Sequence, residues 1–579
     1  MLNPTMSDYE VDRGRAIWNV SIATCSLALL LCIAYVPGFL VAGFTPRAAL
    51  LIAGGIPGGV LLVRLAAKRD RSAVAAAVCV AWVAVSALGS GAPLLALKGT
   101  LGRDLSGLLV LAGFGLWALG RALPERSVPM MSSVVLAGLG CNAAVAIAQV
   151  GLSINDGFFA LQFGRASGLT PSSVYLGALM AAGAALAGAM TSWRFRWRLL
   201  VVSVFGAAVN LSGSRIAAVA GLVTISMLMF GRAGDVARRR RLLLPISFSL
   251  GLVVSAILTS VTVRTHTSTG RLDNGTSSGG RLTAWNYGWD AFLERPFFGW
   301  GFGRFRAATQ GRFSPSFVEL QAPNELTQAW FDAHNVIVTL FVAVGLPGLL
   351  LVVWFGWEAY RSTSGPFVYA TGAIGLTWLL QPSGLTTLPL FMLMLGAAKI
   401  DRETFVVEDG IRRRDWPLYG SAALGVICGS WLLIGDLALR RSVDAGDISG
   451  LENAARMFPH DAVVADVVAQ AWFIEEESDR TLRPTVMKWS QRAVDYEPDR
   501  PYFLSRHAGR QLTFGDYLSA RSTLDRSLEL QEWNIDTWEL MFVLAERTND
   551  VELQMLAESR LCQLEPQSST CTRSLERSP

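Results

Sequence analysis

The chain has 579 residues, of which 52% are hydrophobic and 16% are charged, and its formal net charge is +5. A soluble protein carries about a quarter charged residues, so this composition excludes an ordinary soluble enzyme. The hydrophobic residues fall in runs close to the roughly 20 residues that a helix needs to cross a bilayer. Lipid offers no partner to backbone polar groups, so these runs must be helical. The sequence therefore predicts an all-α, polytopic membrane protein.

About thirteen transmembrane helices are predicted. In chain order they cover residues 16–36, 46–63, 72–89, 104–120, 129–151, 173–191, 197–211, 214–231, 242–263, 335–357, 367–382, 384–398 and 417–437. We expect no cleavable signal peptide, because the first fifteen residues are polar and the first apolar run lacks a small-residue cleavage site.

Lys and Arg residues orient these spans. They gather in every second loop, as in the run Arg238 to Arg241, and such loops stay cytoplasmic. The N-terminus is therefore predicted to be cytoplasmic, and both the long loop 264–334 and residues 438–579 are predicted to be external. The arginine run is a topology signal and does not indicate binding to nucleic acid.

Residues 438–579 are predicted to form a second domain beyond a membrane domain of residues 1–437. The motifs Tyr496–Asp499, Gln531–Asn534 and Leu564–Gln567 recur about every 34 residues, and Met457–His460 is an earlier member displaced by five. A 34-residue period of paired helices resembles tetratricopeptide repeats, which stack into an α-solenoid. Binding a partner and capping the membrane domain are equally compatible roles. Two cysteines of this tail, Cys562 and Cys571, are placed to pair in an oxidising exterior.

A histidine lies where the long external loop meets the tenth span. This residue, His334, is one of four histidines in the chain. A helix starting near Pro323 is expected to run through Trp330 and Phe331 into the span, which places these two side chains on the face of His334 and Asp332 off it. An Asp–His relay is therefore not expected. The alternative role for His334 is that of an interfacial histidine that snorkels.

An amphipathic helix is predicted from Arg281, ending at Pro296. Its apolar stripe suits the membrane surface or the helix bundle and comprises Leu282, Trp285, Trp289, Phe292 and Leu293. Three glycines at 299, 301 and 303 then predict a turn with aromatic anchors, and no strand–helix–strand unit surrounds them to make a dinucleotide site. Gly345 and Gly348 are interpreted as small residues that let helices approach closely.

Arginines on the external side are candidates for binding phosphate. Arg215 opens the eighth span, and an arginine at a span end is functional by default unless it snorkels or has a partner. Its guanidinium suits two-point contact with phosphate oxygens. Arg281 lies on the same side of the membrane, as does His334, a possible general base. Arg165, in the preceding external loop, is a further candidate. No Cys/His set has zinc spacing and no acidic cluster suggests a metal cage.

These residues carry a family resemblance. His334-Asn335, nine residues, Gly345, two residues and Gly348 resemble the signature of the O-antigen ligase and Wzy-type polymerase superfamily. The resemblance extends over about residues 16–400 to Ser214-Arg215, Arg281 with Trp285, the Arg295-Pro296 turn and residues 165–169. The repeat-containing tail and its thirteenth span depart from the minimal ligase pattern.

The resemblance implies a membrane-embedded glycosyltransferase of the GT-C kind that uses no nucleotide sugar, metal or other cofactor. Such an enzyme moves a glycan from an undecaprenyl-pyrophosphate carrier to an acceptor hydroxyl on the external face of a bacterial cytoplasmic (inner) membrane. His334 would act as the general base, and Arg215 and Arg281 would neutralise the leaving diphosphate. Arg165, Trp285 and Asn335 are expected to bind substrate.

The acceptor is left open. A second lipid-linked repeat unit would make the protein a polymerase of surface polysaccharide, which we favour; a lipid-A core would make it an O-antigen ligase, and a protein an O-oligosaccharyltransferase. Two other classes compete: a polysaccharide transporter, expected to have discontinuous helices near the midplane, and a scaffold whose tail gathers other envelope polysaccharide assembly proteins. Deleting residues 440–579 is expected to spare catalysis at least partly in an enzyme and to abolish function in a scaffold.

Overall fold

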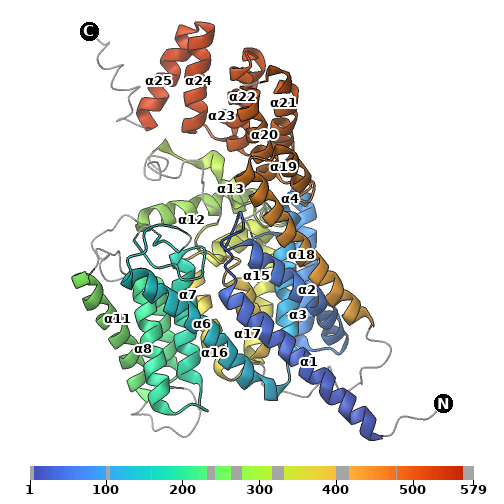
Figure 1. Ribbon diagram of the computed structural model, residues 1–579, viewed down its shortest axis with the longest axis vertical. Coiled ribbons are helices and arrows are strands. Elements are labelled where there is room, and N and C mark those ends of the chain that lie inside the picture. The colour runs from blue at the N-terminus through green and yellow to red at the C-terminus, as the bar shows by residue number, and fades with distance from the viewer. Residues whose placement is uncertain are drawn as a thin grey trace, which may run out of the picture.

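The computed structural model describes residues 6–99, 105–157, 159–162, 164–230, 241–262, 277–315, 332–398, 416–477 and 479–564. Within these ranges the chain forms helices and no β-strand, which confirms the all-α prediction. A bundle of long helices makes up one part of the molecule, and a stack of shorter helices from the C-terminal region lies at one end of it (Figure 1).

A helix lies at each of the thirteen predicted spans. They are α1 (Met6–Ile33), α2 (Thr45–Ala67), α3 (Arg71–Gly89), α5 (Gly107–Arg121), α6 (Val128–Gly151), α7 (Ser173–Ala189), α8 (Phe195–Leu211), α9 (Arg215–Met227), α11 (Leu243–Thr262), α15 (Val336–Arg361), α16 (Pro366–Trp378), α17 (Leu388–Ala397) and α18 (Trp416–Ala445). Five of them, α2, α3, α15, α18 and α6 with the short turn before it, are long and apolar enough to cross a membrane. Six shorter apolar helices accompany them, and the total of thirteen crossings stays a prediction.

Close helix contacts hold the bundle together. Helix α2 packs between α5 and α18, α8 packs on α7 and α11, and α3 packs on α15. At the α2–α5 contact a Cβ atom added to Gly58 would lie 2.0 Å from the carbonyl oxygen of Gly115. The two backbones approach this closely because neither residue has a side chain, which is how small residues serve helix packing in membranes.

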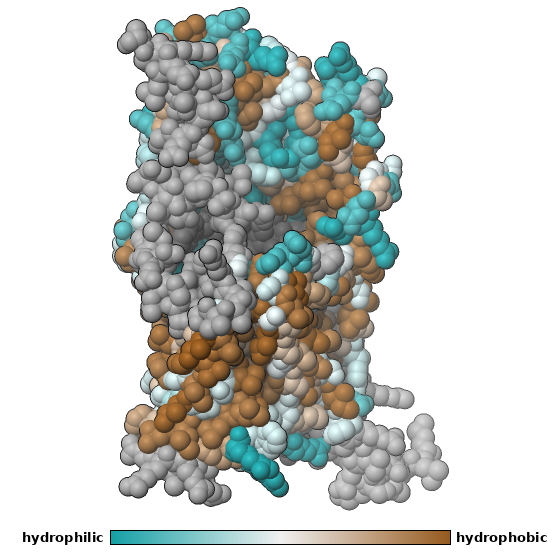
Figure 2. All heavy atoms as spheres, turned by 60° about the vertical axis from the view of Figure 1, so that its left-hand side comes forward, coloured by the Kyte–Doolittle hydropathy of each residue, from teal (hydrophilic) through white to brown (hydrophobic). Residues whose placement is uncertain are grey.

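The outer surface of the bundle is apolar. Exposed side chains on α11 and α18 include Leu250, Ile257, Leu258, Val426, Ile427 and Ile434, each more than half exposed. The face drawn in Figure 2 carries apolar side chains over its lower half, whereas polar side chains dominate the upper part. Exposed apolar surface of this extent is expected where lipid is the solvent.

The C-terminal helices repeat as predicted. They are α19 (Ile448–Ala455), α20 (Ala462–Glu476), α21 (Arg483–Tyr496), α22 (Pro501–Thr513), α23 (Tyr517–Leu530), α24 (Ile535–Thr548) and α25 (Val551–Leu564). Helices α21, α23 and α25 start 34 residues apart, as do α22 and α24. Helix α20 starts 39 residues before α22, and the turn η4 (Arg480–Leu482) in the α20–α21 connection accommodates the predicted excess of five. These helices pack as antiparallel pairs in a tetratricopeptide-like stack, called the repeat domain below.

Helix α18 joins the bundle to the repeat domain without a break. The predicted boundary between residues 437 and 438 therefore falls inside a helix. At this level Asp436 is fully buried, and its carboxylate accepts hydrogen bonds from the Leu40 N–H and from the Thr45 hydroxyl at the start of α2. Near the other end of the domain Cys562 is disulfide-bonded, and its predicted partner Cys571 lies outside the described residues.

Candidate functional site

A cavity of about 1100 Å³ lies among α3, α5, α15, α16 and α17. Most of its wall is apolar and includes Cys79, Phe114, Leu340, Val352, Trp378 and Phe391. Polar side chains also line the cavity, among them Gln162, Ser172, Tyr175, Asp332, His334 and Ser383. An apolar chamber with a small polar set suits a ligand that has a long apolar part and a polar head.

His334 is held in a turn and not in a helix. Its φ is +50°, the left-handed conformation, and α15 begins two residues later at Val336. Asp332 bends back onto it: the Asp332 Oδ1 accepts a hydrogen bond from the His334 N–H at 2.8 Å and lies 3.1 Å from the imidazole Nδ1. The predicted helix through residue 334 was wrong, and so was the exclusion of an Asp332–His334 contact that followed from it. Trp330 and Phe331 lie outside the described residues.

Asn335 caps α15. Its side-chain oxygen accepts hydrogen bonds from the N–H groups of Ile337, at 2.9 Å, and Val338, at 3.2 Å. These are two of the amides that a helix start leaves without intrahelical partners. Asn335 thus fixes the point at which the His334 turn enters α15. The sequence predicted a substrate-binding role for Asn335 and did not predict this capping role.

Helix α12 (Ser277–Glu294) braces the His334 turn from outside. The predicted start was Arg281, and the helix begins one turn earlier, at Ser277. It ends before Pro296, as predicted. The Trp285 indole N–H donates to the Ala333 carbonyl at 2.8 Å. Arg281 lies one helical turn before Trp285 and so shares its face. This arrangement brings the Arg281 segment to the residue next to His334.

The predicted apolar stripe of α12 divides between two environments. Phe292 is buried and Trp285 is half-buried, whereas Leu282, Trp289 and Leu293 are 50–57% exposed. The first pair faces the protein. The exposed set is compatible with the predicted position of α12 on the membrane surface.

Arg215 is the first residue of α9, as predicted. Ser214 caps this helix, and its hydroxyl also accepts a hydrogen bond from the amide of Gln381. The three residues after Gln381, Pro382 to Gly384, line the cavity. Among the described residues none forms a hydrogen bond or ion pair with the Arg215 guanidinium, which is half-buried.

The loop that carries Arg165 lies against the same turn. Its neighbour Ala166 donates a backbone hydrogen bond to Leu211 at 3.1 Å, just before the Ser214-Arg215 pair. Arg165 also exchanges two backbone hydrogen bonds with Gln162, whose side chain lines the cavity. The structure thus brings the Arg165 and Arg215 segments together beside the cavity. Of the six predicted site residues, His334 is the one whose own side chain lines it.

A buried arginine that the sequence reasoning passed over supports this loop. Arg47 is fully buried at the start of α2, and its guanidinium donates to the carbonyl groups of Gly43 and Leu169, each at 2.7 Å. Arg47, like Arg215, is an arginine at the end of a predicted span. Tyr175, which lines the cavity with His334, was not predicted, and Asp332 was considered but excluded. Only the spatial meeting of distant segments reveals Tyr175.

Helix α15 is broken at Gly345, where φ is +67° and ψ is −176°. The break frees backbone carbonyls, and the turn after α12 uses them: the Trp300 N–H donates to Val342 at 2.7 Å and the Gly301 N–H donates to Ala343 at 2.9 Å. The Trp82 indole donates to the Val344 carbonyl at 2.9 Å. Gly345 is thus a conformational requirement, beyond the close-packing role predicted for it.

The glycine-rich turn, residues 299–303, takes its shape from its hydrogen bonds to the break in α15. All three of its glycines have positive φ, and Gly301 and Gly303 line the cavity. The predicted turn is confirmed, and it has the added task of pairing with the break in α15. Together the two backbone segments form one wall of the cavity beside the His334 turn.

Comparison with known proteins identifies the region that builds this wall. Residues 199–353 match the O-antigen ligase family. The match spans α8 to the middle of α15 and contains Arg215, Arg281, His334 and the Gly345 break. The predicted resemblance is confirmed over these residues. Arg165 lies outside the matched residues.

Two further comparisons add little. No curated protein matches the chain. Among solved structures, one similar chain comes from the crystal structure of the APC/C hetero-tetramer Cut9–Hcn1, with 12% sequence identity, coverage of 80% of this chain and 90% of that chain, and a TM-score of 0.23. A score this low carries no conclusion about fold or partner.

Proposed function

We propose that the protein transfers a glycan from an undecaprenyl-pyrophosphate carrier to an acceptor hydroxyl on the external face of a bacterial cytoplasmic membrane. The observation that carries the proposal is the position of His334: its imidazole lines a mostly apolar cavity, with Asp332 at Nδ1, inside the region that matches the O-antigen ligase family. The apolar chamber suits the polyprenyl chain, and the polar lining suits the junction between pyrophosphate and sugar.

The Asp332–His334 contact favours one tautomer for catalysis. A proton on Nδ1 would be donated to Asp332 across 3.1 Å, and Nε2 would then be the basic nitrogen of the ring. Nε2 would then remove the acceptor hydroxyl's proton as its oxygen attacks the anomeric carbon. The bond from that carbon to the phosphate oxygen breaks, the electron pair leaves with the diphosphate, and direct displacement inverts the anomeric centre.

Arginines would stabilise the leaving group. The diphosphate gains negative charge as the bond to the sugar breaks, and Arg215 and Arg281 are the proposed counter-charges. The described residues provide no ion-pair partner for Arg215, and this is compatible with the proposed role. Arg165 is proposed to add a contact from the neighbouring loop, and Trp285 supports His334 through Ala333.

The test is glycan transfer by the purified full-length protein, with a synthetic lipid-pyrophosphate-linked glycan as donor. His334→Asn tolerates the left-handed backbone and removes the base, so it should lower kcat by about 10²–10⁴-fold. A matched control is His460→Asn, because His460 is exposed and also has positive φ, +61°. Asp332→Asn should weaken transfer by a smaller factor. Full activity of His334→Asn would refute the proposal.

The acceptor is proposed to be a second lipid-linked repeat unit, which makes the enzyme a polymerase. Cells carrying His334→Asn distinguish the acceptors. A polymerase defect accumulates single lipid-linked repeats, a ligase defect accumulates long lipid-linked polymer, and a protein glycosylation defect leaves the protein acceptor unmodified.

The transporter alternative gains one observation from the structure, the broken helix α15. Broken helices in transporters present free backbone groups to an ion or substrate. Here the carbonyls of Val342, Ala343 and Val344 are occupied by Trp300, Gly301 and Trp82. The break is therefore used for packing, which favours glycan transfer over transport. Flux through liposomes without any glycan transfer would reverse this preference.

A further inference from the structure

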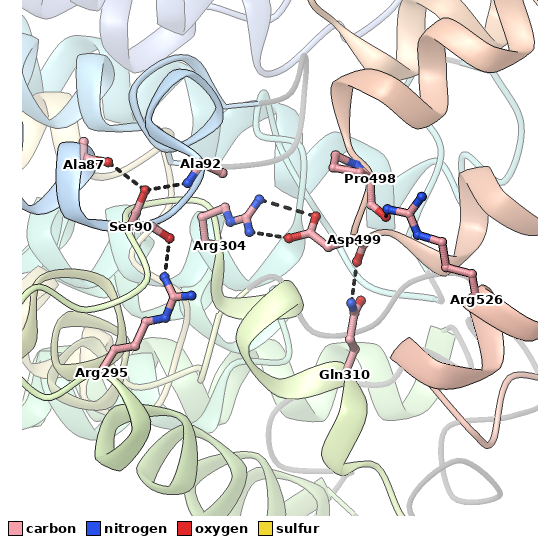
Figure 3. A network of polar contacts seen from close by, with 9 residues as sticks. All are labelled: Ala87, Ser90, Ala92, Arg295, Arg304, Gln310, Pro498, Asp499 and Arg526. Atoms are coloured by element: carbon pink, nitrogen blue, oxygen red, sulfur yellow. Dashed lines mark hydrogen bonds and ion pairs between the residues drawn. The ribbon is translucent and has the colours of Figure 1, made fainter.

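The repeat domain contacts the rim of the cavity through an ion pair between a buried arginine and a partly exposed aspartate. Arg304 stands between Gly303 and Phe305, both of which line the cavity. Its guanidinium donates to both carboxylate oxygens of Asp499, in the turn between α21 and α22 (Figure 3). Arg304 is 5% exposed. The segment Trp300–Phe305 is called the rim below.

Further contacts fix the partners of this ion pair. The Gln310 amide donates to the Asp499 backbone carbonyl, and Arg526 of α23 donates to the carbonyl of Pro498 at 3.1 Å (Figure 3). Asp499 is thus held from both sides, by the segment after the rim and by the repeat domain itself. The ion pair joins two parts of the molecule that are each locally fixed.

The membrane bundle holds the other side of the rim. Arg295 donates to the carbonyl of Ser90 at the end of α3, and its guanidinium lies 4.2 Å from the centre of the Trp300 ring. Figure 3 shows Ser90 and Asp499 on opposite sides of Arg304. The rim therefore lies between the bundle and the repeat domain.

An apolar contact reinforces the attachment. The short segment after the rim contains α13 (Phe305–Thr309) and η2 (Gln310–Arg312), and Phe313 follows. The Phe313 ring is buried in the main apolar cluster of the repeat domain, together with Leu512, Leu524 and Trp538. Removing the domain would expose this ring and leave Arg304 without its anion. The expectation that catalysis partly survives deletion of residues 440–579 is therefore revised: deletion should disrupt the cavity.

A short path of contacts leads from the ion pair to His334. Phe305 packs in a buried cluster with Ala291, Ala333 and Val342. Ala333 precedes His334, and its carbonyl accepts the Trp285 hydrogen bond. A displacement of Arg304 would shift Phe305 and then the His334 turn, because packed interiors transmit small shifts.

Charge makes the rim dependent on Asp499. A buried guanidinium without a counter-charge is strongly unfavourable. The Arg304 Nε has no hydrogen-bond partner in the described structure. The hydrogen bonds of the guanidinium to Asp499 are made by its two terminal nitrogens. Loss of the carboxylate would drive the guanidinium toward water and move the rim with it.

We propose that Asp499 is a positioning residue for glycan transfer. Through Arg304 and Phe305 it fixes the position of the cavity rim relative to the His334 turn. The inference rests on the proposed function. It assigns the repeat domain a direct part in the reaction, in addition to any partner that it binds.

The experiment compares Asp499→Asn with Asp525→Asn in the full-length protein. Asp525 forms an exposed ion pair with Arg521 in the same domain and serves as the matched control. Asp499→Asn should lower kcat on the order of tenfold or more, with KM changed by less than about twofold, because misplacing a catalytic group slows chemistry more than binding. Asp499→Glu should restore part of the rate. A kcat equal to that of Asp525→Asn overturns the proposal.

Two additions keep the test decisive. If Asp499→Asn fails to fold, the double variant Arg304→Gln with Asp499→Asn removes both charges, leaves no unpaired ion, and is judged by the same criterion. Hydrogen exchange of residues 299–309 needs no substrate and should be faster in Asp499→Asn than in Asp525→Asn. If the wild type transfers no glycan, the proposed function fails and hydrogen exchange still decides whether Asp499 holds the rim.

Discussion

Replacing Gly345 by alanine is expected to destabilise the protein and to remove most of the proposed glycan transfer. The residue has φ +67° and ψ −176°, a combination that is essentially restricted to glycine. Holding any other residue there costs about 1–3 kcal/mol. The substitution therefore acts on the backbone of α15 at the wall of the cavity.

The added methyl group would also collide with backbone atoms. Its Cβ would lie 2.2 Å from the carbonyl oxygen of Phe297. Relief requires that the two segments separate, which weakens the hydrogen bonds from Leu346 to Pro296, at 2.8 Å, and from Trp300 to Val342, at 2.7 Å. At about 1 kcal/mol for each bond, and about 2 kcal/mol for the backbone strain, the total is about 4 kcal/mol.

The assay is thermal unfolding in detergent, followed by tryptophan fluorescence, together with the transfer rate. Gly140→Ala is the control, because Gly140 lies inside α6 and its added Cβ meets no atom within 4 Å. This control should change stability by at most about 1 kcal/mol, in the stabilising direction. If Gly345→Ala unfolds at the same temperature as the control and transfers glycan at the wild-type rate, the break does not support the site.

Two further outcomes are expected in and around the repeat domain. His507 is buried beside Ser490 and Arg510, and burial, with a smaller effect of the Arg510 charge, lowers the pKa of its imidazole from 6.5 to about 4. The unfolded chain binds this proton near pH 6.5 and the folded domain only near pH 4, so the stabilisation is complete above pH 6.5 and declines by about 3 kcal/mol as the pH falls to 4. His507→Gln should remove this part of the pH dependence of unfolding, and identical pH profiles would contradict the argument. Phe313→Ala should destabilise the protein by about 3–5 kcal/mol, whereas Phe297→Ala, whose ring is 64% exposed, should change the melting temperature little; equal melting curves would show that the Phe313 ring does not anchor the domain.

Much of the helical framework could be predicted from the sequence, because its signals are local. Each predicted span contains a helix, and the start of α9 falls at Arg215 as expected. The repeat period was also readable, since paired helices of constant length impose a constant spacing. Apolar periodicity and helix starts depend on neighbours a few residues apart, and such neighbours are visible in the sequence.

The geometry of the site depends on partners that are distant in sequence. Gly345 breaks α15 because residues 296–301 supply the hydrogen bonds that the break needs, and apolar periodicity carries no trace of that pairing. Asp332 was set aside on the assumption of a helix through His334. The left-handed turn at His334 removes this assumption and brings the two side chains together.

Because helix α18 is uninterrupted, it fixes the rotation of the repeat domain relative to the membrane bundle. One residue inserted between Asp436 and Ala445 would turn everything beyond it by about 100° and advance it by about 1.5 Å. Asp436 would remain at its place beside α2, while Asp499 would swing away from Arg304. Changes of length in this part of α18 are therefore restricted by helical phase.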